Sequence, residues 1–151
     1  MKVEYINPFI QATENSFKML CGLDVERNGS LRLSSDSIHS KDDVFGVVNV
    51  SGEANGSIAI VIPPQIARKI IKIILQESTL TDEDLLDGVG EILNTIVGGA
   101  TAQLPRVKIS APKIMFGKDP KYYRITKKPW VVIPMHIPDK GEFSIEVSFD
   151  D

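Results

Sequence analysis

The stretch DGVGEILNTIVGG, residues 87–99, decides the fold, because it reads as a helix with two contrasting faces. At about 100° per residue, Asp87, Glu91 and Asn94 fall together on one face. Thr81, which precedes three acidic residues, is typical of the N-cap of this helix. The opposite face is apolar and predicts burial; it holds Leu85, Val89, Ile92, Leu93, Ile96 and Ala100. The sequence therefore predicts an amphipathic helix that displays two carboxylates and a carboxamide.

Glycine is unexpectedly frequent in this helix, at positions 88, 90, 98 and 99. Each glycine in a helix interior costs about 1 kcal/mol of stability relative to alanine. Gly90 and Gly98 border the polar stripe, where a missing side chain allows another backbone to come close. We therefore predict that Gly90 and Gly98 belong to a docking surface.

The charges of the helix also favour a partner. From Asp82 to Leu104 the chain carries five acidic residues and no Lys or Arg. Asp87 and Glu91 are like charges four residues apart, which destabilises a helix by about 0.2–0.5 kcal/mol. Glu91 also lies beyond the first turn, where the helix dipole no longer favours an acid. A solvated surface is the ordinary explanation of a polar stripe, but this pattern favours a partner that supplies the missing cation.

Two further helices are predicted. The first begins with Asn7 as its cap and Pro8 in its first position, and it ends at Gly22. The second covers PQIARKIIKIILQ, residues 64–76, where isoleucines recur at helical spacing.

Several β-rich runs surround these helices. Residues 44–62 contain two such runs around GEANG, which predicts a hairpin. The remaining runs lie at residues 30–35, 106–117, 128–138 and 141–149. Three helices with five or six strands and no detectable linker predict one α+β domain over residues 1–151, with a largely antiparallel sheet and packed helices.

Composition excludes several classes of function. The net charge of −3 does not favour binding to nucleic acid or to an anionic membrane. We expect no signal peptide and no membrane span, because no apolar run is long enough. The single cysteine, Cys21, excludes an internal disulfide, fits a reducing cytoplasm and is expected to be a buried structural thiol.

Two other candidate sites are weaker. His39 and His136 lack neighbours at metal-ligand spacing, so we predict no metal site. The stretch KDPKYYRITKKPW, residues 118–130, mixes basic and aromatic side chains, as single-stranded nucleic-acid sites do. On an acidic chain, an exposed loop and an edge strand protected by lysines is the better interpretation.

The residues DGVGEILN, with the spacing Asp-x3-Glu-x2-Asn, resemble the signature of the CheC/CheX/FliY family of chemotaxis phosphatases. INPFIQATENSFKML resembles the opening helix of CheX, and GVVNVSGEANGSIAIVIP resembles the central hairpin of the family. The motif occurs once, which is closer to CheX than to CheC. The resemblance implies a CheC-like/CheX-like fold for a single CheX-like domain.

The resemblance also implies a function, namely hydrolysis of the aspartyl phosphate of a CheY-like receiver domain in chemotaxis or another two-component pathway. Asn94 would orient the attacking water, because a carboxamide offers both a donor and an acceptor. Glu91 would pair with a receiver lysine, and Asp87 would tune docking or stay solvated. The chain would need no cofactor of its own, since the receiver would supply Mg²⁺. A homodimer is also implied, and the alternative function is a non-catalytic module that binds a receiver.

In one respect the chain departs from the family pattern, which continues to a proline that would fall at Gly117. The nearest prolines are Pro105, which also marks the end of the helix, and Pro112. The stretch SAPKIMFG around Pro112 resembles the expected strand. We therefore predict a shortened connection between helix and strand, with a loop of altered shape.

Overall fold

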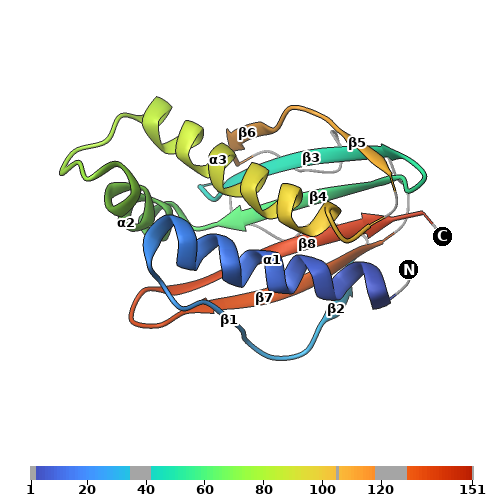
Figure 1. The fold of residues 1–151 in the computed structure, drawn as a ribbon. Coiled ribbons are helices and arrows are strands. Elements are labelled where there is room, and N and C mark those ends of the chain that lie inside the picture. Colours follow the sequence, from blue (N-terminus) through green and yellow to red (C-terminus); the bar gives the residue numbers. More distant parts are fainter. Residues whose placement is uncertain (1–2, 35–41, 105, 118–128, 151) are drawn as a thin grey trace.

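The computed structural model describes residues 3–34, 42–104, 106–117 and 129–150. Within these ranges the chain forms three helices and an eight-stranded antiparallel sheet, so the predicted α+β class is confirmed. The helices are α1 (Val3–Cys21), α2 (Pro64–Leu75) and α3 (Asp82–Thr101). Figure 1 shows α1 and α3 side by side across one face of the sheet, with α2 at one end of them.

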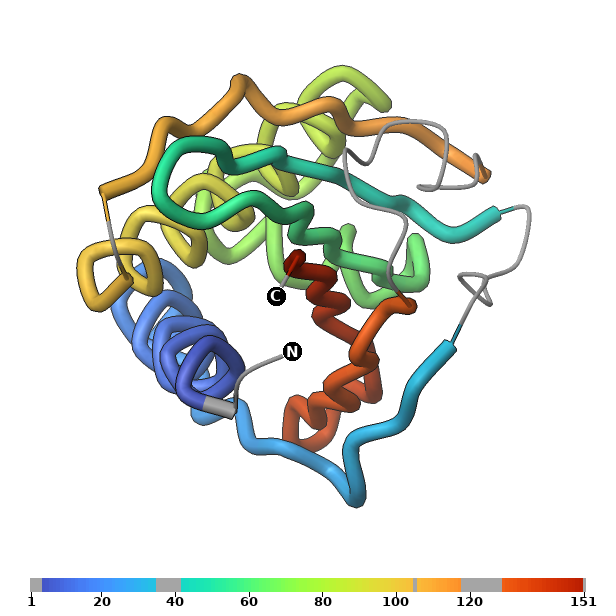
Figure 2. The backbone as a smooth tube through the Cα atoms, turned by 90° about the vertical axis from the view of Figure 1, so that its right-hand side faces the viewer, coloured from blue at the N-terminus to red at the C-terminus, as the bar shows by residue number. Residues whose placement is uncertain are grey.

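The strands are β1 (Glu26–Arg27), β2 (Arg32–Ser34), β3 (Val44–Gly52), β4 (Gly56–Ile62), β5 (Val107–Ile109), β6 (Lys113–Phe116), β7 (Trp130–Ile137) and β8 (Gly141–Phe149). Their order is β1-β7-β8-β4-β3-β5, while β2 also pairs with β7 and β6 with β3. The sheet curves around the helices, as the view along it shows (Figure 2). The predicted hairpin around GEANG is confirmed as β3 and β4.

The core lies between the helices and the concave side of the sheet. Ile58, Ile60 and Ile62 of β4 are fully buried in the same cluster as the apolar faces of the three helices. Ala59 and Val61, which point the other way along β4, are also buried. The central strand is therefore buried on both faces.

Helix α1 begins earlier than predicted, because Val3 opens it and Pro8 lies inside it. The predicted start at Asn7 is wrong. The additional turn buries Ile6 together with Phe9, and this burial outweighs the one backbone hydrogen bond that the proline ring removes. The predicted end is confirmed, since Gly22 has a positive φ of 69° and its N–H donates to the Lys18 carbonyl at 3.0 Å.

The exposed loop and edge strand predicted for residues 118–130 stay a prediction, because the structure describes only residues 129 and 130 of that stretch. Trp130 begins β7, which is not an edge strand, since it pairs with β8 on one side and with β1 and β2 on the other. Its indole is fully buried, so it is not available to stack on a nucleic-acid base. The other residues of that stretch up to 128 lie outside the described residues, as does His39. Among the helices described, none is both long and apolar enough to cross a membrane.

Candidate functional site

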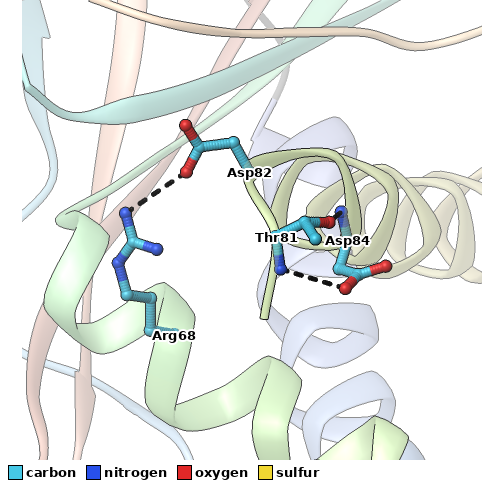
Figure 3. A network of polar contacts seen from close by, with 4 residues as sticks. All are labelled: Arg68, Thr81, Asp82 and Asp84. Atoms are coloured by element: carbon cyan, nitrogen blue, oxygen red, sulfur yellow. Dashed lines mark hydrogen bonds and ion pairs between the residues drawn. The ribbon is translucent and has the colours of Figure 1, made fainter. Parts of the chain in front are cut away.

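Helix α3 is fixed at its start by a capping box. The Asp84 N–H donates to Thr81 Oγ1 and the Thr81 N–H donates to Asp84 Oδ2, both at 3.0 Å, which confirms Thr81 as the N-cap (Figure 3). Nη2 of Arg68 in α2 lies 3.6 Å from Oδ1 of Asp82, and Figure 3 marks this ion pair with a dashed line. This ion pair is exposed and therefore weak. Arg68 therefore pairs with one acidic residue of α3, Asp82, which is not part of the polar stripe.

The two faces of α3 lie as the sequence predicts. Its six predicted apolar residues are all fully or almost fully buried, whereas Asp87, Glu91 and Asn94 are exposed. We call these three residues the polar ridge. Within the described ranges, neither a hydrogen bond nor an ion pair ties a side chain of the ridge to the rest of the chain. The backbone of the ridge does take part in hydrogen bonds, since Thr95 Oγ1 donates to the Glu91 backbone carbonyl at 2.8 Å. Within the described part of the chain, the lack of a partner therefore concerns the side chains of the ridge and not its backbone.

Two of the four glycines are explained by packing within the chain. A Cβ on Gly88 would lie 2.5 Å from Cδ1 of Ile71 in α2, and one on Gly90 would lie 3.3 Å from Cγ1 of Ile114 in β6. These two glycines thus allow α2 and β6 to approach α3 closely. A Cβ on Gly99 would lie 3.4 Å from Cβ of Ala12 in α1, which is an ordinary van der Waals distance, so this contact does not require a glycine.

Gly98 is different, because a Cβ there would meet nothing within 4 Å. Gly98 is exposed beside the polar ridge, and no neighbour among the described residues accounts for a glycine there. Its predicted place in a docking surface is compatible with this position and stays a prediction. The same role for Gly90 also stays a prediction, although packing against Ile114 already explains why position 90 is small.

A hollow of about 540 Å³ opens beside the ridge. Its apolar part comes from Leu86, Pro112 and Ile114, which the sequence did not identify as site residues. The other lining residues are Glu83, Asp87, Gly90, Glu91 and Asn94. The site therefore combines an exposed acidic rim with a half-buried apolar floor, and the Asn94 carboxamide is part of the same lining.

A β-bulge places Pro112 at this hollow. The predicted strand over residues 106–117 is interrupted, because β5 and β6 both pair with β3 but residues 110–112 face only residues 48 and 49. One extra residue bends the strand. Asn49 holds the bend, since its N–H donates to Ser110 Oγ at 2.9 Å and its carbonyl accepts from the Ser110 N–H at 2.8 Å. Pro112 within a β-rich run was the sequence signal for this bulge.

The remaining candidates are structural or lie elsewhere. Burial raises the pKa of the Cys21 thiol to about 11, so the thiol stays protonated at neutral pH and is a poor nucleophile. His136 lies in β7. Among the described residues, no three side chains of His, Cys, Asp or Glu come together as a metal site.

Solved structures share this fold over almost the entire chain. CheX from Desulfovibrio desulfuricans has 28% sequence identity and a TM-score of 0.83, with 98% of this chain and 100% of that chain covered. CheX from Vibrio vulnificus has 26% identity and a TM-score of 0.82, with the same coverage. CheX in a CheX–CheY–BeF3–Mg²⁺ complex from Borrelia burgdorferi has 20% identity and a TM-score of 0.80, with 99% and 100% covered, which shows a common fold.

Sequence comparison agrees with the fold. No curated protein matches the chain significantly. The model of the family described as chemotaxis phosphatase CheX matches residues 44–136, which include β3, the hairpin, α2 and the polar ridge of α3. The resemblance of the motif, the match to the family model and the shared CheX-like fold lead to one conclusion: the chain belongs to the CheX family of chemotaxis phosphatases.

Proposed function

We propose that this protein hydrolyses the aspartyl phosphate of a CheY-like receiver domain. The observation that carries the proposal is the polar ridge, whose acid and amide side chains are exposed on a rigidly packed helix and have no partner within the described chain. Membership of the CheX family supports a phosphatase, and the Borrelia burgdorferi complex of CheX with CheY supports a receiver as partner.

Asn94 is the group that orients water in this proposal. The water oxygen forms a bond to phosphorus in line with the bond to the receiver aspartate, which breaks and leaves a carboxylate and inorganic phosphate. The Asn94 carboxamide can accept a hydrogen bond from the water and donate one to a phosphoryl oxygen. A carboxylate at this position would repel the phosphoryl group, whereas the amide is neutral.

Glu91 is the docking group. Its carboxylate lies one turn before Asn94 on the same face, and no cation of the described chain pairs with it. A receiver lysine next to the phosphorylated aspartate would form a charge-assisted hydrogen bond with Glu91 and fix the register of docking. Asp87, another turn away, either tunes this docking electrostatically or stays solvated. Mg²⁺ belongs to the receiver in this proposal, and the chain contributes no metal ligand.

The test uses a purified CheY-like receiver phosphorylated by a small phosphodonor in Mg²⁺. Release of inorganic phosphate is followed with the wild-type protein and with Asn94→Ala. We expect the wild type to accelerate release by at least about a hundredfold over the variant, since water positioning acts in the transition state. Binding of the receiver should persist in Asn94→Ala, because Glu91 is intact.

Two results would contradict the proposal. If the wild type and Asn94→Ala released inorganic phosphate equally fast, the Asn94 carboxamide would have no role in hydrolysis. Binding of several receivers without acceleration by the wild type would leave the alternative, a module that binds a receiver and does not turn it over. The homodimer stays a prediction as well, and light scattering of the purified protein tests it.

A further inference from the structure

The hollow beside the polar ridge has an apolar floor to which the proposed reaction assigns no role. Leu86, Pro112 and Ile114 form this floor, and all three are half-buried. Leu86 and Ile114 also pack against the buried core, so the floor belongs to the fixed part of the fold. Strand β6 lies beside α3 here (Figure 1). Apolar surface that stays accessible inside a hollow is typical of a binding site.

The rim of the same hollow is acidic. Glu83, Asp87 and Glu91 follow one another at intervals of four residues along α3, and all three are exposed and line the hollow. The lining contains no Lys, Arg or His, and none of the three carboxylates forms an ion pair within the described part of the chain. The hollow therefore presents a negative potential above an apolar surface.

The hollow and Asn94 share one side of α3. At 100° per residue, every α3 residue in the lining lies within about 80° of Asn94 around the helix axis. Asn94 is itself in the lining, and Gly90, in the middle of it, is about 6 Å away along the axis. A receiver that brings its phosphoryl group to Asn94 therefore also faces the mouth of the hollow.

The two parts of the lining select the kind of side chain that fits. An acidic side chain would be repelled by the rim, and a purely apolar one would cover carboxylates without pairing them. A lysine or arginine matches both parts, because its aliphatic stem can lie on apolar surface while its charged end reaches a carboxylate. The volume of about 540 Å³ is ample for one side chain, since sites of about 300–1,000 Å³ hold small-molecule ligands.

We infer that the hollow receives a second basic side chain of the docked receiver, whose stem lies on the apolar floor and whose charged end pairs with Glu83 and Asp87. This inference rests on the proposed function, in which a first lysine pairs with Glu91 beside the phosphoryl group. The second charge would lie about 10–16 Å from Asn94 along α3. It would decide which receivers dock, since a receiver without a basic residue at that place would leave the hollow unfilled.

The experiment measures the dissociation constant of a CheY-like receiver held active by beryllium fluoride and Mg²⁺, and KM with the phosphorylated receiver. Glu83→Lys reverses the charge at the far end of the hollow and should raise both values at least about tenfold. Leu86→Ala removes part of the floor without changing the charge and should raise both at least about threefold. Glu77→Lys is the matched control and should stay within about twofold of the wild type. It makes the same change of charge at an exposed residue that does not line this hollow.

A charge swap identifies the basic residue of the receiver. Each exposed lysine and arginine around the phosphorylated aspartate of the receiver is changed to glutamate, and each variant is titrated with the wild type and with Glu83→Lys. At one position other than the lysine that Glu91 pairs with, the receiver variant should bind Glu83→Lys at least about tenfold more tightly than independent effects of the two changes would give.

The outcomes are distinct. The inference is overturned if Glu83→Lys binds as the wild type does, if Glu77→Lys weakens binding equally, or if no receiver residue couples to position 83. Wild-type binding by Leu86→Ala would also overturn it, because the stem would then not lie on the floor. If the wild type hydrolyses the phosphate and both hollow variants behave identically to it, the inference alone fails. If the wild type neither binds nor turns over any receiver, the proposed function fails and takes the inference with it. Thermal unfolding of each variant checks that the fold is intact.

Discussion

At the residue scale, Glu91 is unfavourable for its own helix, and in the proposed function its carboxylate serves the partner. It repels Asp87 one turn away, and no described cation compensates for it. Glu91→Gln should therefore leave the free energy of unfolding unchanged or raise it by about 0.2–0.5 kcal/mol. If a receiver lysine pairs with the carboxylate, the same change should raise KM about tenfold or more, because a hydrogen bond to a charged group contributes about 1.5–3 kcal/mol.

Urea denaturation and steady-state kinetics check the two halves of this prediction. Asp87→Asn is the control, since it relieves the same repulsion and removes a less central carboxylate. An unchanged KM in Glu91→Gln would mean that this carboxylate is merely solvated. Reversal of the receiver lysine to glutamate, combined with Glu91→Lys, should recover part of the lost affinity.

The residue scale is also where the sequence was most informative about the site. Helical spacing alone predicted that Asp87, Glu91 and Asn94 share one exposed face, and the structure confirms that all three are exposed. Spacing could not predict the apolar floor of the hollow. Pro112 and Ile114 reach α3 only through the pairing of β6 with β3, which is a long-range contact.

At the element scale, the glycines of α3 differ in what surrounds them, and two substitutions test this difference. Gly88→Ala places a methyl group within 2.5 Å of the fully buried Ile71, which cannot move aside cheaply. We expect a net loss of about 1–2 kcal/mol in the free energy of unfolding, because overpacking exceeds the gain in helix propensity. Gly98→Ala meets no neighbour and should gain about 0.5–1 kcal/mol.

Kinetics then test the docking role of Gly98. If the receiver approaches the helix backbone there, Gly98→Ala should raise KM several-fold even though it stabilises the protein. Denaturation curves and KM values of both variants provide the check. A Gly98→Ala variant that is more stable and equally active would leave position 98 outside the interface.

The elements themselves were predicted unevenly, for physical reasons. Strong periodicity with a good cap predicted α3 and its start at Thr81. The start of α1 was mispredicted, because a proline signal near Asn7 is local whereas burial of Ile6 is tertiary. The run over residues 106–117 was predicted as one strand, and a bulge divides it, because only the register with β3 determines where the extra residue lies.

At the scale of the whole molecule, the sheet provides the rigidity that the proposed role of the Asn94 carboxamide needs. A misplacement of about 1 Å can lower a rate about a hundredfold. The ridge is carried on a helix whose opposite face, including Leu93 and Ile96, is fully buried against the sheet. Beneath it, β4 is paired on both sides and buried along its entire length. We expect this unit to open only when the protein unfolds globally.

Amide hydrogen exchange tests this expectation. The amides of Ile58 and Ile60 in β4 should exchange with a free energy equal to that of unfolding in urea. The backbone amides of Leu93 and Ile96 should exchange with the same free energy, since α3 and the central strands share one core. Leu33, exposed on the short strand β2, should exchange through a local opening of much lower free energy. If instead the free energy of exchange is several kcal/mol lower for α3 than for β4, the helix opens by itself. The side-chain carboxamide of Asn94 would then acquire its position only when a receiver docks.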